Sequence, residues 1–70
     1  MQKVDNRIIS EMLRSKVLIV FNDGKSVATR IGRILAVDEH FIYIWSERSR
    51  SYEAIALHSI IRMEFFNSKR

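Results

Sequence analysis

Apolar and polar residues alternate along most of the chain, a pattern typical of strands that bury one face. Five segments carry it: residues 16–22, 25–38, 41–45, 52–57 and 60–66. The pair Asp23-Gly24 predicts a tight turn after the first segment, because glycine readily adopts the positive φ that hairpin turns need. Gly32 interrupts the longest segment, where we expect a bulge or a sharp bend. The pattern therefore predicts five short strands.

Residues 5–14 follow a different period, and we expect them to form a short helix ahead of the first strand. Asp5 or Asn6 can cap its first turn with a side-chain acceptor. The apolar residues at 8, 9, 12 and 13 then share one stripe. A helix of about ten residues does not persist alone in water, so this stripe is expected to lie against the sheet. The final residues, 67–70, are predicted to be a polar tail.

The connections between the predicted strands are very short, which favours antiparallel neighbours in a meander. Five strongly bent strands in so few residues predict a mainly β domain, a small open barrel with the helix on one end or face. The whole chain, residues 1–70, is expected to be this single domain.

Composition points to self-association as the source of stability. A chain of 70 residues that is 47% hydrophobic has little interior in which to bury those side chains. Small domains compensate with disulfides, metals or oligomerisation. The chain has no Cys, and its two His are far apart in sequence, so neither a disulfide nor a metal site is expected. We expect no cofactor and a homo-oligomer.

The net charge of +4, with Arg as the main cation, favours a polyanionic partner. No apolar run approaches the roughly 20 residues needed to cross a membrane, and the first ten residues lack a signal-peptide pattern. We therefore expect a cytoplasmic protein with no membrane partner. There is no Cys nucleophile and no glycine-rich phosphate loop, so an enzyme is not expected.

Several stretches together resemble the Sm-like superfamily, and most closely the bacterial RNA chaperones of the Hfq type. They are "VLIVFNDG", Gly32, "RILAVD", "FIYIW" and "LHSIIRM", and they cover nearly the whole chain. The resemblance implies a short N-terminal helix followed by five bent strands of an SH3-type barrel. It also implies a ring of about five to seven copies, in which the fourth strand of one copy pairs with the fifth strand of the next.

The resemblance further implies where RNA and neighbouring copies bind. A pore face for single-stranded RNA is expected at His58, His40 and Phe41, and a basic rim at Arg7, Arg14 and Lys16. The expected contacts between copies are Tyr52, Ile55, Ile60, Met63 and Phe65. Ile42 stands where Sm proteins usually have an Asn that contacts uracil, so the chain departs from the family at the base-reading position.

Alternatives to the RNA-binding ring remain open. One is that the same ring serves as a protein scaffold, and the other is that the chain is a monomeric SH3-like binding module. Arg30, Arg33, Arg48 and Arg50 are expected to form a second basic surface, which Glu47 and Glu53 would partly neutralise. Tyr43 and Trp45 alternate along the third strand and are expected in the core or at an interface.

Overall fold

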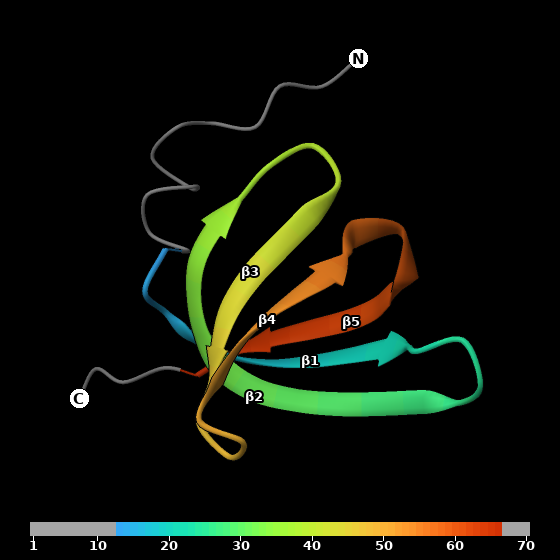
Figure 1. The fold of residues 1–70 in the computed structure, drawn as a ribbon, viewed down its shortest axis with the longest axis horizontal. Coiled ribbons are helices and arrows are strands. Elements are labelled where there is room, and N and C mark those ends of the chain that lie inside the picture. The colour runs from blue at the N-terminus through green and yellow to red at the C-terminus, as the bar shows by residue number, and fades with distance from the viewer. Residues whose placement is uncertain (1–12, 67–70) are drawn as a thin grey trace.

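The computed structural model describes residues 13–66, and they form one antiparallel sheet of five strands (Figure 1). The strands are β1 (Lys16–Asn22), β2 (Val27–Val37), β3 (Phe41–Ser46), β4 (Ser51–Ala56) and β5 (Ile60–Phe65). A single 3₁₀ turn, η1 (Leu57–Ser59), separates the last two strands. The expectation of a mainly β fold with five antiparallel strands is confirmed, and each strand lies within a few residues of its predicted range.

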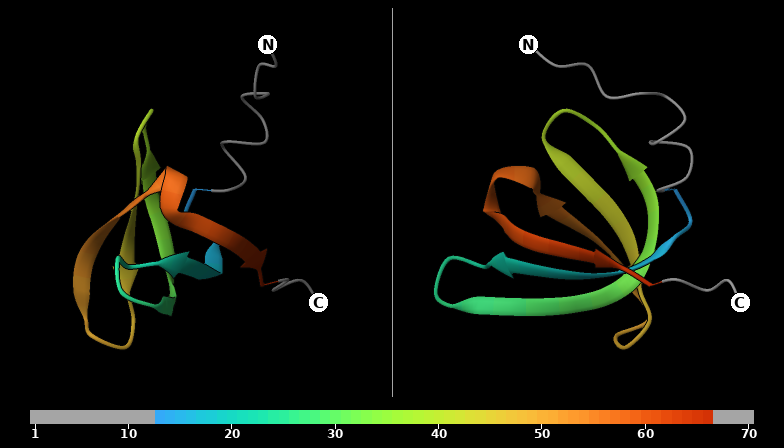
Figure 2. Two further views of the ribbon diagram at one scale, coloured as in Figure 1. Left: turned by 90° about the vertical axis from the view of Figure 1, so that its right-hand side faces the viewer. Right: turned by 180° about the vertical axis from the view of Figure 1, so that it is seen from behind.

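The strand order in the sheet is β4-β3-β2-β1-β5, so β5 pairs with β1 and not with β4. The predicted meander is therefore right for the first four strands and wrong for the last. The physical reason is the strong curvature of the sheet, which brings the end of β4 close to the start of β5 at η1 (Figures 1 and 2). The hydrogen-bonded ladder does not close, and β4 and β5 remain its two edges.

One face of the sheet forms the core. Alternate residues of β1 and β3 supply most of it, because successive side chains of a strand point to opposite faces. The buried apolar residues are Val17, Ile19, Phe21, Ile34, Ile42, Ile44 and Ile55. Tyr43 and Trp45, which were expected in the core or at an interface, lie on the opposite face of β3 and are half-buried, so they are not core residues and the interface stays a prediction.

The bend in β2 has two parts. Its register against β3 shifts between Ile34 and Ala36. The bulge therefore lies after Gly32, although it was expected at Gly32 itself. Gly32 is buried, and its backbone lies against the carbonyl group of Trp45 in β3. A Cβ at this position would meet the carbonyl carbon of Trp45 at 3.0 Å and its oxygen at a still shorter distance. The glycine therefore permits close approach of two backbones.

The predicted hairpin turn at Asp23-Gly24 is present between β1 and β2. Gly24 has a φ of 102°, and the carboxylate of Asp23 accepts hydrogen bonds from the amides of Lys25 (2.9 Å) and Ser26 (3.0 Å). These backbone hydrogen bonds, that of Lys25 foremost, lower the pKa of Asp23. Asp23 is therefore ionised at neutral pH.

Asp38 holds the turn between β2 and β3. One carboxylate oxygen accepts hydrogen bonds from the amides of His40 (2.8 Å) and Phe41 (2.7 Å), and the other accepts one from the hydroxyl of Tyr43 (2.7 Å). The hydrogen bond from Tyr43, followed by those from the two amides, lowers the pKa of Asp38. The ionised carboxylate is the form that this turn stabilises.

Tyr43→Phe is expected to raise the pKa of Asp38 toward its ordinary value, because it removes the main hydrogen bond to the carboxylate. The depressed pKa in the folded chain means that Asp38 contributes stability above its unfolded pKa. This contribution is lost as the pH falls through the folded pKa. The pH titration of the Asp38 carboxyl carbon by NMR, in the native chain and in Tyr43→Phe, measures the change. An unchanged pKa in Tyr43→Phe would contradict the assignment.

The expected helix at residues 5–14 lies almost entirely outside the described residues, as does the predicted tail at 67–70. Its last two residues, Leu13 and Arg14, form a turn before β1. The amide of Arg14 donates to the carbonyl of Ile34, and Leu13 packs against the core. Within residues 13–66, no helix has the length and apolar character needed to span a membrane.

Candidate nucleic-acid interface

An open cleft of about 490 Å³ lies at the corner where η1 joins β4 to β5, and we call it the His58 cleft. Phe41 and His58, two of the three residues predicted for the pore face, line it together. Its lining residues come from the end of β1 and the β1–β2 turn, from β2, from the start of β3, from β4 and from η1. They are Phe21, Asn22, Asp23, Gly24, Arg30, Phe41, Glu53, Ala54, Ile55, Ala56, His58 and Ser59.

The fold explains why Phe41 and His58 meet although they are 17 residues apart in sequence. Phe41 begins β3 and pairs with Ala56 at the end of β4. The amide of Leu57 then donates to the carbonyl of His40 at 2.8 Å, and the hydroxyl of Ser59 donates to the carbonyl of Ala56 at 2.8 Å. These bonds fix η1 against the start of β3. Both His58 and Phe41 remain exposed, Phe41 to 39%.

His40, the third residue predicted for the pore face, does not line the His58 cleft. Its side chain is exposed and lies 3.8 Å from the carboxylate of Glu39. It adjoins the cleft only through its carbonyl, which holds η1. The structure therefore brings together two of the three predicted pore-face side chains.

The charges around the His58 cleft do not favour an anion. Among the described residues that line it, Arg30 is the only Arg or Lys, whereas Asp23 and Glu53 supply two carboxylates. The lowered pKa keeps Asp23 ionised. What the cleft offers is an exposed aromatic ring and an imidazole, groups that stack on bases or bond to base edges.

The predicted basic rim is described only in part. Arg7 lies outside the described residues, and Arg14 is exposed and forms no ion pair with another residue of 13–66. The ammonium group of Lys16 lies 3.5 Å from Glu47 and 5.5 Å from the ring centre of Phe66. Because Lys16 is already paired, Arg14 is the stronger candidate of these two for a phosphate contact.

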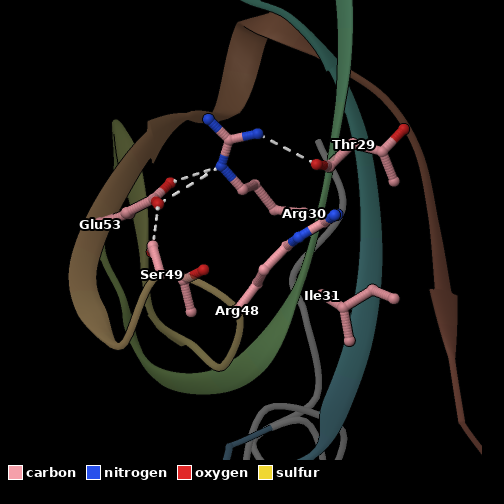
Figure 3. A pocket seen from close by; sticks show the side chains of 7 residues that line it. Thr29, Arg30, Ile31, Arg48, Ser49 and Glu53 are labelled. Carbon is pink, nitrogen blue, oxygen red and sulfur yellow. Dashed lines mark hydrogen bonds and ion pairs between the residues drawn. The ribbon is translucent and has the colours of Figure 1, made fainter.

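The second basic surface, predicted from four arginines, divides into paired and unpaired members. Arg33 pairs with Glu47 at 3.7 Å and Arg30 with Glu53 at 3.0 Å, the partial neutralisation that was expected. Arg48 and Arg50 in the β3–β4 turn form no ion pair with any other described residue. Arg48 reaches a cleft of about 280 Å³ that also contains Arg30 (Figure 3).

The predicted contacts between copies differ in exposure. Tyr52 on β4 is 76% exposed and Phe65 on β5 is 44% exposed, so both side chains are open to a partner. Ile60 and Met63 are half-buried against the core. The side chain of Ile55 is only 4% exposed, because it points to the core face opposite Ile42, so we no longer assign it to an interface.

The sequence analysis missed two features of these edges. Ile61 is 59% exposed. It lies at a register shift in the β1–β5 pairing, where Ile60 and Arg62 each have a partner residue on β1 and Ile61 has none. Tyr52 packs edge-to-face on Trp45, with ring centres 4.9 Å apart, which places both aromatic rings on the outer face. Strand alternation alone predicts neither feature, since each depends on how two strands pair.

Within residues 13–66, no three His, Cys, Asp or Glu side chains gather closely enough to hold a metal ion. Comparisons of the chain with protein-family models, with curated proteins and with solved structures find no match.

Proposed function

We propose that the chain forms a homo-oligomeric Sm-like ring that binds single-stranded RNA. The observation that carries this proposal is the identity of the two sheet edges. They are β4 and β5, the two strands that the family resemblance would join between neighbouring copies. Each edge carries exposed apolar side chains, Tyr52 on β4 and Ile61 and Phe65 on β5.

Pairing β4 with β5 of the next copy stabilises the ring in two ways. It satisfies the backbone amide and carbonyl groups along both edges, which otherwise invite aggregation. It also removes apolar surface from water, at about 25 cal/mol per Å², which contributes several kcal/mol per interface before the costs of association. Since every copy has one edge of each kind, the contact is head-to-tail and can close into a ring.

In this ring, RNA bases stack on Phe41 and His58 in the His58 cleft, one such cleft in each copy. The cleft holds two carboxylates and one arginine, so its contribution is stacking and base-edge hydrogen bonds. Phosphate contacts come from unpaired cations elsewhere, of which Arg14 lies on the predicted rim. The protein concentrates and holds RNA and forms or breaks no covalent bond.

Two measurements test the proposal. Native mass spectrometry at micromolar concentration is expected to give a closed oligomer, and a single-chain mass would overturn the ring and favour the monomeric SH3-like module. Affinity for uridine-rich and adenine-rich oligonucleotides is then measured over a salt series. A fall in affinity with increasing salt indicates phosphate contacts. A ring that binds neither oligonucleotide would be a protein scaffold.

His58→Ala is expected to weaken RNA binding about fivefold or more without changing the mass of the oligomer, because a stacked base is worth about 1–3 kcal/mol. His40→Ala is the matched control, since His40 is an exposed histidine that does not line the cleft. Fluorescence anisotropy with a labelled oligonucleotide measures both affinities. Equal losses in the two variants, or no loss in either, would remove the His58 cleft from the RNA site.

The scaffold is the second candidate, and the charge of the His58 cleft favours it. Asp23 and Glu53 oppose the approach of a polyanion to this part of the molecule. Ile42, at the position where Sm proteins usually have an Asn, also favours the scaffold. An isoleucine side chain cannot form a hydrogen bond with a base edge, and this one is buried in the core. An intact ring without affinity for RNA is the result that would decide for this candidate.

A further inference from the structure

A second cleft lies at the other end of β3 and β4, beside the β3–β4 turn, and we call it the Arg48 cleft (Figure 3). Its volume is about 280 Å³, and its lining residues are Thr29, Arg30, Ile31, Ser46, Arg48, Ser49 and Glu53. Arg30 and Glu53 line both clefts, so their ion pair lies between them. The two clefts can therefore be distinguished by residues that belong to only one of them.

Arg30 is held in position inside the Arg48 cleft. Its Nε donates to both carboxylate oxygens of Glu53, at 3.0 and 3.3 Å, and its Nη1 donates to the carbonyl of Thr29 at 3.0 Å. Its guanidinium also lies 5.5 Å from the ring centre of Phe21. These contacts leave Nη2 without a partner among the described residues, so a fixed guanidinium still has N–H groups to donate.

Arg48 supplies the second cation. It enters from the β3–β4 turn and extends toward β2, whereas Arg30 extends from β2 toward β4, so the two side chains cross the cleft in opposite directions (Figure 3). No described residue forms an ion pair or a hydrogen bond with its guanidinium. Nearby, the hydroxyl of Ser49 is bonded to that of Ser51 at 2.7 Å and to Glu53 at 3.4 Å.

The charge balance separates this cleft from the His58 cleft. The Arg48 cleft contains two arginines and one carboxylate, and that carboxylate is already engaged by Arg30. Its net charge of +1 attracts an anion, whereas the His58 cleft, with one arginine and two carboxylates, does not. Guanidinium groups suit phosphate in particular, because their N–H groups match its oxygens in pairs.

We propose that the Arg48 cleft binds a phosphate group, with Arg48 and the free Nη2 of Arg30 as donors and Ile31 as an apolar wall beside it. The volume is close to the lower limit of about 300 Å³ for small-molecule sites, so the cleft suits a phosphate with part of its sugar. The phosphate comes either from the backbone of single-stranded RNA or from a free nucleotide. Only the first source rests on the proposed function.

The test is an NMR titration of the native chain with inorganic phosphate, with uridine monophosphate and with a short uridine-rich oligonucleotide. We expect the amide signals of the β3–β4 turn to shift with inorganic phosphate and with the nucleotide. Arg48→Ala is expected to weaken binding of both about tenfold, the loss of one charge-assisted contact. Arg50→Ala is the matched control, because Arg50 is an unpaired arginine of the same turn that does not line the cleft.

The outcomes separate this proposal from the ring and from the His58 cleft. No phosphate-induced shift in the native chain, or equal affinities in Arg48→Ala and Arg50→Ala, overturns it. If the oligonucleotide competes with inorganic phosphate for these signals, the site binds the RNA backbone, and if only the nucleotide competes, the site binds free nucleotides. Either result supports the cleft. A native mass spectrum and the His58→Ala affinity are read separately and do not affect this outcome.

Discussion

Replacing Gly32 with alanine is expected to destabilise the fold by about 3 kcal/mol or more, the upper range for overpacking. The added Cβ would meet backbone atoms of Trp45, and the side chain of Ile44 at 3.3 Å. A side chain can change its rotamer, whereas the carbonyl of Trp45 belongs to the central β2–β3 pairing and cannot move without breaking it. A 70-residue domain has a total stability of about 3.5–10 kcal/mol, so much of it would be lost.

Urea denaturation followed by the fluorescence of Trp45 measures this loss. Gly24→Ala is the comparison, because a Cβ at Gly24 has nothing within 4 Å and its cost comes only from the φ of 102°. That cost is about 1–2 kcal/mol. We expect Gly32→Ala to be the less stable of the two variants. Equal midpoints, or a more stable Gly32→Ala, would show that β2 and β3 approach less closely than the structure has them.

Gly32 also illustrates what the sequence could and could not predict about the fold. The alternation of apolar residues predicted all five strands, because a half-buried strand needs a period of two. The glycine within the second strand predicted an irregularity. Whether that irregularity is a bulge or a close approach of two backbones depends on which atoms of β3 lie opposite the glycine, and the sequence of β2 alone does not show this.

The position of β5 could not be predicted for a related reason. A short connection such as η1 usually joins neighbours in a sheet, and this preference favoured pairing of β4 with β5. The whole sheet is curved, so its two edges approach the same corner. The chain that leaves η1 as β5 therefore pairs with β1 instead of β4. Periodicity identifies strands and their faces, but partners are chosen by the geometry of the assembled sheet.

The candidate site was predicted best where a local turn decides the geometry. His58 and Phe41 share a cleft because η1 bonds to the residue before Phe41, and both residues were singled out in the sequence. The charges were harder to predict. Arg30 and Glu53 are 23 residues apart, and their pairing, which separates the two clefts, depends on the curl of β2 toward β4.

The exposed edges lead to the prediction with the clearest effect on assembly. Phe65→Lys is expected to dissociate the proposed ring into single chains that remain folded. Phe65 lies on the edge strand β5 and is 44% exposed in one chain, so its side chain has apolar surface left to bury against a partner. Burial of such a side chain is worth about 1.5–3 kcal/mol, which is roughly 10- to 100-fold in affinity at every interface of the ring.

Leu35→Lys is the matched control, because Leu35 is also 44% exposed but lies at the bulge of β2 and not on either of the edge strands β4 and β5. Native mass spectrometry and circular dichroism of both variants separate assembly from folding. Phe65→Leu, which keeps an apolar side chain, is expected to restore most of the oligomer. If Leu35→Lys dissociates the ring as Phe65→Lys does, the contact between copies uses the outer face of the sheet. If neither does, β5 is not where copies meet, and edge pairing no longer accounts for the exposed apolar residues of β4 and β5.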